Sequence, residues 1–176
     1  MPVHLLGWGC LMRGGWLQNV GLSSIGTRRI YLAQIALMVV LDHLQDPNNL
    51  GAIIRTAEAV GCAGVCIPRR RAAAVTPAVV RASAGATEHV PVFRVGNISR
   101  TIERLKRVGY WAVALDSAGD QHWDQVDYST SIALVVGAEG KGLHRLVLNR
   151  CDHRVALPML GDVASLNVSV AFAVVA

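Results

Sequence analysis

From residue 35 onward, short apolar runs alternate with longer segments in which apolar positions recur every three or four residues. Short apolar runs are typical of strands buried on both faces, and the longer period is typical of helices that cover such a sheet. The runs predict strands at residues 35–42, 64–68, 90–95, 110–115, 131–136 and 153–158. The intervening segments predict helices at residues 50–61, 76–86, 100–109, 143–151 and 163–176. This alternation predicts an α/β fold with a mostly parallel sheet flanked by helices.

Composition sets the first residues of the chain apart from the rest. Residues 1–41 contain no Asp or Glu but include three arginines, a bias that occurs in organelle transit peptides. The Gly and Trp content of this segment fits no regular amphipathic helix. We therefore predict one domain at residues 35–176, preceded at residues 1–34 by an extension that is poorly ordered or not native. The last predicted helix reaches the end of the chain without a capping residue, which predicts a truncated C-terminus.

Charge and cysteine content narrow the class of protein. The net charge of +5 and the isoelectric point of about 9.4 favour a polyanionic partner such as nucleic acid; a mildly basic surface without such a partner is the alternative. The four cysteines lack CxxC spacing, so we expect free thiols in a reducing cytosol rather than zinc or redox sites. No apolar run reaches the ~20 residues that span a membrane, which predicts a soluble, cytoplasmic protein.

A glycine-rich segment, VVGAEGKGLHRLV at residues 135–147, follows a predicted strand and precedes a predicted helix. Open α/β sheets bind ligands at this place, outside the carboxyl ends of their strands. Gly137, Gly140 and Gly142 let a ligand approach the backbone closely. The spacing is neither that of a P-loop nor GxGxxG, so it does not specify a nucleoside triphosphate or a dinucleotide. An ordinary strand-to-helix turn explains the glycines equally well, with Glu139 as a capping or ion-pairing residue.

A second polar segment, DPNNLGAIIRTAEA at residues 46–59, leads from a predicted strand into an amphipathic helix. Asn48 or Asn49 is expected to cap this helix. Arg55 lies on a different face from the apolar positions. Its simplest role is an ion pair with Glu58, three residues further along the helix.

A third segment, LPMLGDVASLNVSVA at residues 157–171, places Ser165, Asn167 and Ser169 along an otherwise apolar stretch. The simplest interpretation is a loop followed by a helix on which these polar side chains are incidental. Small polar groups near a buried helix start nevertheless need hydrogen-bond partners, which favours a ligand or another subunit.

In their order and spacing, DPNNLGAIIRTA, VVGAEGKGL and LPMLGDVASLNVSVA resemble the three motifs of the SpoU/TrmH family of RNA ribose 2′-O-methyltransferases. The similarity runs from about residue 32 to the last residue, and IPRRRAAAVTPAVVRASAGATEHVPV resembles the branch that modifies 23S ribosomal RNA. The resemblance implies mostly parallel strands with a C-terminal deep trefoil knot, an exception to unknotted connections. It also implies a homodimer that binds S-adenosylmethionine in the knot and methylates a ribose 2′-hydroxyl, in this branch of a 23S rRNA guanosine.

The resemblance assigns roles to particular residues. It implies that Arg55 is essential for methyl transfer; because arginine stays protonated below pH ~12, substrate positioning suits it better than proton abstraction. The other polar residues implied at the reaction site are Asn49, Glu139, Ser165 and Asn167. The implied cofactor contacts, largely through backbone, are Leu115, Gly137, Gly140, Leu157 and Leu166. The candidates for contacts with RNA phosphates, or else for an ordinary solvated surface, are Arg69, Arg70, Arg71 and Arg81. No metal is expected, because the sulfonium already supplies an activated leaving group.

Other functions stay open at this stage. A tRNA ribose methyltransferase would carry the same motifs. A non-catalytic RNA-binding protein that keeps the knotted fold would bind the cofactor without transferring its methyl group. An NAD- or nucleotide-dependent enzyme is supported by the glycines alone, and binding of NAD in place of S-adenosylmethionine would favour it.

Overall fold

The computed structural model describes residues 35–176, whose strands form one seven-stranded sheet in the order β3-β2-β1-β6-β4-β7-β5. Every neighbouring pair in this sheet is parallel. The strands are β1 (Leu37–Asp42), β2 (Gly64–Pro68), β3 (Val92–Val95), β4 (Trp111–Leu115), β5 (Gln121–His122), β6 (Ile132–Gly137) and β7 (His153–Ala156). The predicted parallel α/β architecture is therefore confirmed. Because all strands run the same way, the loops that follow them gather at one edge of the sheet.

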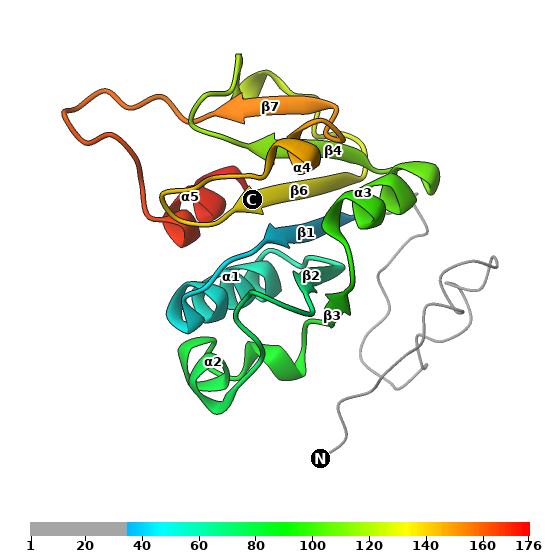
Figure 1. Cartoon of the computed structure of the whole chain (residues 1–176), viewed down its shortest axis with the longest axis vertical. Helices are drawn as coiled ribbons and strands as arrows, with labels where there is room; N and C mark the ends of the chain where they lie inside the picture. The colour runs from blue at the N-terminus through cyan, green and yellow to red at the C-terminus, as the bar shows by residue number, and fades with distance from the viewer. Residues whose placement is uncertain (1–34) are drawn as a thin grey trace, which may run out of the picture. The chain divides into compact units, whose positions relative to one another are not determined.

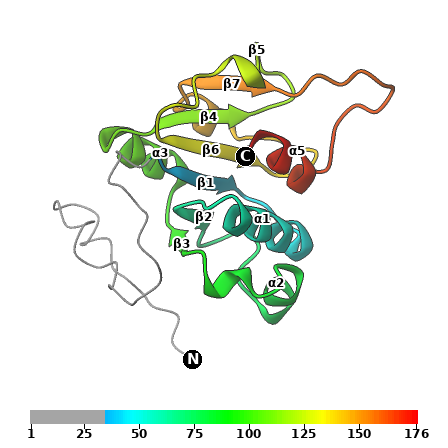
Figure 2. The same cartoon turned by 180° about the vertical axis from the view of Figure 1, so that it is seen from behind.

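Helices cover both faces of the sheet, as Figures 1 and 2 show from opposite sides. They are α1 (Pro47–Ala59), α2 (Pro77–Ala82), α3 (Ile98–Arg107), α4 (Arg145–Leu148) and α5 (Val168–Val175), with short 3-10 turns at η2 (Ala86–Glu88) and η3 (Trp123–Gln125). α3 and α4 lie on one face, whereas α1 and α5 lie side by side on the other. α2 packs on α1, where a Cβ at Gly51 would approach the Cβ of Ala82 to 2.4 Å.

The core surrounds the central strands β1 and β6. Every residue of β6 is buried, and Leu37 alone is partly exposed in β1. This double-sided burial explains why both strands read as continuous apolar runs instead of alternating patterns. Phe172 of α5 and Ile53 of α1 are fully buried in the same cluster as Leu134 of β6. Burying each such side chain stabilises the fold by about 1.5–3 kcal/mol.

Two helix starts differ from the predictions. α1 begins at Pro47, and its cap is Asp46, whose side chain accepts a hydrogen bond from the backbone N of Asn48. The prediction that Asn48 or Asn49 caps this helix was therefore wrong. α5 begins at Val168 and not at residue 163, because the side chain of Asn167 accepts from the backbone N of Ser169 and caps the helix there.

Smaller differences concern the second half of the sheet. The polar loop after β4 contains β5 and the turn η3, neither of which the apolar pattern predicts. The predicted helix at residues 143–151 shortens to the single turn α4.

Residues 1–34 lie outside the described residues, so the extension predicted there stays a prediction. The free thiol expected at Cys10 stays a prediction for the same reason. Cys62, Cys66 and Cys151 are free thiols, as expected, and the first two are buried. Among residues 35–176, no helix is both long and apolar enough to cross a membrane.

Candidate functional site

A polar network joins the three candidate segments at the carboxyl edge of the sheet, and its centre is the side-chain amide of Asn49. This residue, near the start of α1, is only 9% exposed. Its Nδ2 donates to Oδ2 of Asp46 at 3.1 Å and also to Oε1 of Glu139. Its Oδ1 accepts from Nδ2 of Asn167 at 3.1 Å and from Oγ of Ser169 at 3.4 Å. Both donors and both acceptor positions of the amide are thereby used.

Asn167 has two roles, because it also caps α5. Its Oδ1 accepts from the backbone N of Ser169 at 2.9 Å and from Oγ of Ser169 at 2.6 Å. Ser169 thus belongs to the network, although the motif comparison did not select it as a site residue. The signal that could have identified it is its position two residues after a capping asparagine, where side-chain and backbone bonds to the cap are common.

The glycine segment forms a tight loop after β6. Ala138 and Gly142 exchange two backbone hydrogen bonds, of 3.1 and 2.8 Å. Gly140 and Gly142 have φ of +70° and +63°, a region that L side chains rarely adopt. A Cβ at Gly137 would lie 2.3 Å from the carbonyl carbon of Gly142, so this glycine permits the loop's own backbone to close. The loop in turn presents Glu139 to Asn49.

Arg55 lies outside this network. Its side chain is exposed on α1, and within the described part of the chain no ion pair joins it to Glu58. The local ion pair offered as its simplest role is therefore absent. Both groups are exposed, and such a pair gains little over hydration.

The remaining candidates line up along the loops after β4 and β7. Leu115 ends β4, and Leu157 follows β7; both are half-buried against the core. Figure 1 shows residues 157–167 as a long orange-red arc that leaves β7 and returns to α5. Ser165 and Leu166 lie on this arc and are exposed. Ser165 makes no hydrogen bond with another described residue, so the structure does not bring it into the network.

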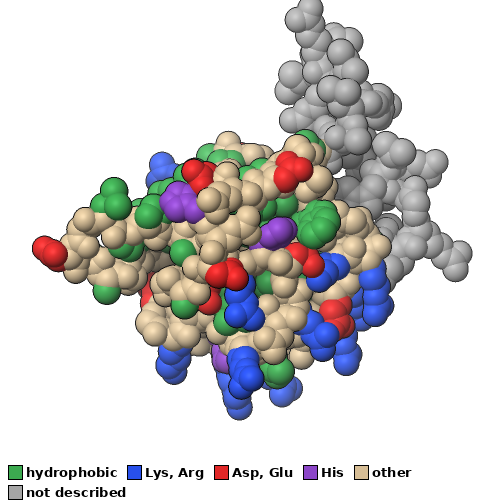
Figure 3. Space-filling model, turned by 90° about the horizontal axis from the view of Figure 1, so that it is seen from above, with side chains coloured by type: hydrophobic (Ala, Val, Ile, Leu, Met, Phe, Trp, Pro, Cys, Tyr) green, Lys and Arg blue, Asp and Glu red, His purple; other side chains and the backbone are tan. Residues whose placement is uncertain are grey.

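Basic side chains gather along one border of the view in Figure 3. All four arginines proposed for RNA contact are exposed, and Arg81 lies in the last turn of α2. Arg69 and Arg94 are tied together, because each guanidinium donates to the other residue's backbone carbonyl at 3.2 Å. The carbonyl of Arg71 accepts from Nε2 of Gln45 at 2.6 Å, which fixes this loop beside the segment that leads into α1.

A parallel sheet with a polar network and a glycine loop at its carboxyl edge places the chain among α/β proteins, a class in which open sheets bind ligands at that edge. Comparison with known protein families agrees with the resemblance seen in the three motifs. Residues 36–176 match the SpoU rRNA Methylase family, and the chain belongs to this family. The resemblance found in the three motifs is thereby confirmed at the level of the family.

Individual relatives support the same assignment. The chain is 50% identical over 133 residues to Bacillus subtilis YacO, whose name describes a TrmH family tRNA/rRNA methyltransferase; the match covers 76% of this chain and 53% of that protein. The chain thus spans about half the length of the curated relatives it matches.

Solved structures agree as well. The SpoU methyltransferase AviRb of Streptomyces viridochromogenes, in complex with the cofactor AdoMet, superposes with a TM-score of 0.76 at 30% identity, over 83% of this chain and 60% of that chain. A structure described for 2-OH methylation of C/U34 on tRNA superposes with a TM-score of 0.71 at 29% identity. The match covers 80% of this chain and 91% of that chain.

Proposed function

We propose that this chain transfers a methyl group from S-adenosylmethionine to a ribose 2′-hydroxyl of RNA. The observation that carries the proposal is the Asn49 network, which links Glu139 and Asn167 at the edge where this fold binds ligands. The family membership and the AdoMet-bound neighbour support the same cofactor.

The cofactor site that we propose is built from three adjacent loops. β6, β4 and β7 are neighbours in the sheet, and Leu115 pairs in register with Val136 on one side and Val155 on the other. The loops after these strands therefore start next to one another, which groups Leu115, Gly137, Gly140, Leu157 and Leu166 as candidate contacts. Backbone N–H and C=O groups together with leucine side chains suit an adenosine that needs both polar and apolar contacts. When bound, S-adenosylmethionine supplies a methyl group on a sulfonium.

Within this proposal the chain's own residues position the substrate. Glu139, Asn49 and Asn167 hold the network rigid, and Ser165, exposed on the arc, is free to contact RNA or cofactor. Arg55 keeps its positive charge and orients the ribose or an adjacent phosphate. Its exposed position on α1 leaves it available to an RNA or to a second copy of the chain.

We further propose a homodimer. The arc and α5 expose apolar side chains that one chain leaves uncovered, among them Leu160 (98% exposed), Val163 (64%), Val170 (49%) and Val174 (47%). Apolar groups concentrated on one segment favour burial against a partner. We also propose that the arc at residues 157–167 contributes to a trefoil knot, which a structure with bound cofactor would test by tracing the path of this segment.

For the substrate we propose 23S rRNA, with a guanosine as the target and with Arg69, Arg70, Arg71 and Arg81 contacting phosphates. A tRNA is the second candidate, because one structural neighbour is described for methylation of tRNA.

The test is methyl transfer from labelled S-adenosylmethionine to unmodified rRNA and tRNA, with mapping of 2′-O-methylated riboses. The matched pair of variants is Arg55→Ala and Arg100→Ala, which remove exposed arginines from α1 and α3 respectively. We expect methylation of one ribose, abolished by Arg55→Ala and retained by Arg100→Ala. Cofactor binding by a folded protein without transfer to either RNA would contradict the enzyme and favour a non-catalytic RNA-binding role.

A further inference from the structure

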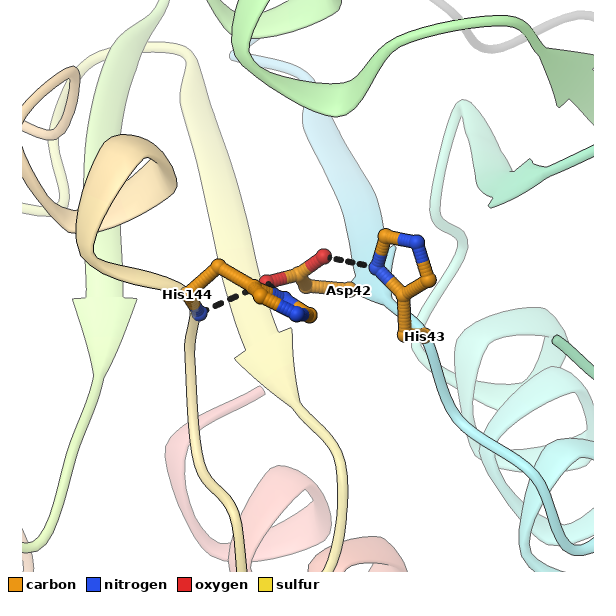
Figure 4. Close-up of side chains that lie close together, drawn as sticks. All are labelled: Asp42, His43 and His144. Atoms are coloured by element: carbon orange, nitrogen blue, oxygen red, sulfur yellow. Dashed lines mark hydrogen bonds and ion pairs between the residues drawn. The ribbon is translucent and has the colours of Figure 1, made fainter. Parts of the chain in front are cut away.

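A second polar cluster lies at the end of β1, and within residues 35–176 no hydrogen bond joins it to the Asn49 network. Figure 4 shows Asp42 between the rings of His43 and His144. Oδ1 of Asp42 lies 2.5 Å from Nδ1 of His43, and Oδ2 lies 2.8 Å from Nδ1 of His144. The same Oδ2 accepts the backbone N–H of His144 at 2.8 Å. The two imidazole rings meet edge to face, with centroids 4.6 Å apart.

The cluster combines a buried carboxyl group with accessible imidazoles. The side chain of Asp42 is 0% exposed, whereas those of His43 and His144 are 34% and 61% exposed. A carboxylate taken out of water needs positive charge or hydrogen-bond donors close to it. His43 is held in the left-handed region, with φ of +58°, which is uncommon for a residue other than glycine. The neighbouring His43 and the distant His144 thus converge on one buried carboxyl group, and the two imidazole rings are accessible to solution.

We propose that Asp42, His43 and His144 bind one divalent first-row transition-metal ion of the zinc type, with water completing its coordination. Two imidazole nitrogens and a carboxylate oxygen are a ligand set that Zn²⁺ accepts with one position open. Candidate ligand atoms from the three residues lie within 4.8 Å of one another. Metal bonds of about 2.0–2.2 Å in a tetrahedron place ligand atoms about 3.4 Å apart, so the exposed rings need shifts on the order of 1 Å.

The ion replaces protons and requires no other reactant. At 2.5 and 2.8 Å the imidazole–carboxyl contacts are hydrogen bonds, each of which shares a proton. A neutral imidazole carries one ring proton, so each ring that turns its Nδ1 to the cation carries that proton on Nε2, and the cation takes the place of the hydrogen on Nδ1. Because Asp42 pairs in register with Gly137, and His144 follows the glycine loop, the ion links the end of β1 to the far end of that loop. This site departs from the expectation that no metal is needed, and it does not depend on methyl transfer.

The test uses the full chain, stripped with a chelator, titrated with ZnCl₂ in a calorimeter. The variants are His43→Gln and His144→Gln. The control is His122→Gln, which removes an imidazole paired with the carboxylate of Asp124. We expect one ion per chain, a loss of affinity of about tenfold or more in each of the two site variants, and no change in the control. Unchanged affinity in both site variants, or an equal loss in the control, would overturn the site.

A second measurement keeps the test decisive if a variant fails to fold. The unmodified chain is titrated with Co²⁺ and followed by visible absorption. Bands of nitrogen and oxygen coordination, displaced by Zn²⁺, support the site. Sulfur-to-metal charge transfer would place the ion on cysteines instead and overturn the proposal, as would the absence of any new band.

Discussion

The Asn49 network makes a specific prediction about a pair of substitutions, Asn49→Asp and Glu139→Gln. In the unsubstituted chain the amide of Asn49 donates to two carboxyl groups, those of Asp46 and Glu139. Asn49→Asp keeps the size of the side chain but replaces these donors with a carboxylate that faces the same two groups. The substitution therefore converts two attractive contacts into two repulsive ones.

The magnitude follows from the distances and the burial. Two unit charges about 4 Å apart repel by about 1 kcal/mol in water and about 4 kcal/mol near a protein surface. Glu139 is exposed and Asp46 only half-buried, which favours the lower end of that range for each pair. With the lost hydrogen bonds at about 1 kcal/mol each, we expect Asn49→Asp to lower the free energy of unfolding by about 2–4 kcal/mol. Glu139→Gln alone costs about 1 kcal/mol or less, because its amide oxygen still accepts from Asn49.

The double variant is the informative one. The amide introduced at position 139 can donate to the carboxylate introduced at position 49, which removes one of the two repulsive contacts and leaves that with Asp46. We expect urea unfolding to give a favourable coupling energy of about 1–2 kcal/mol in the double-mutant cycle. Asn97→Asp is the control, since the Asn97 side chain accepts from the backbone N of Arg100 and a carboxylate accepts the same bond. Additivity within ~0.3 kcal/mol, or a neutral Asn49→Asp, would refute the network.

Further predictions concern the loop, a thiol and the core. Gly137→Ala should lower the free energy of unfolding by about 1–3 kcal/mol, because its Cβ would lie 2.3 Å from the carbonyl carbon of Gly142. The same substitution should weaken S-adenosylmethionine binding in calorimetry. The control is Gly96→Ala, because nothing lies within 4 Å of a Cβ at that position. Burial raises the pKa of the Cys66 thiol to about 12, so the fold favours its protonated form. That stabilisation is complete below the ordinary thiol pKa of 9.0 and is lost as the pH rises toward 12, which urea unfolding at successive pH values should record as a steady decline. Phe172→Ala should cost about 3–5 kcal/mol in the same assay, because the ring is fully buried beneath α5, and a loss under 1 kcal/mol would contradict that packing.

The hydrophobic pattern predicted the elements that cross the core and misplaced those that do not. β1 and β6 are buried on both faces, so each is a continuous apolar run whose limits are visible in the sequence. The arc before α5 has equally apolar residues, such as Val163, and its part from residue 163 onward was predicted as helix. Val163 is exposed, and the helix begins only at Val168, after its cap Asn167. Apolar composition alone therefore does not distinguish a buried helix from an exposed segment whose apolar side chains are free to contact a ligand or a partner.

Motif spacing located the network, whereas the Asp42 cluster could not be found in this way. Asn49, Glu139 and Asn167 were grouped through the resemblance, and the structure joins them by direct hydrogen bonds. Asp42 and His144 are 102 residues apart, and the pairing of β1 with β6 is what brings them together. The available signal was small: a single aspartate at the end of a strand that is otherwise apolar. Such a residue is buried by its strand and needs a partner from elsewhere in the fold.

The position of Arg55 on α1 constrains how the proposed site can work. Asn49 and Arg55 are six residues apart on one helix, which separates them by about 9 Å along the axis and about 240° around it. Asn49 points to Glu139 and Asn167, so Arg55 projects from another side of α1, toward solvent. One ribose cannot contact both residues of one chain unless the RNA wraps around the start of α1. In the homodimer that we propose, a second copy that supplies its own Arg55 would remove this difficulty, because the network would hold the proposed cofactor loops of one chain while the arginine would orient the substrate of the other.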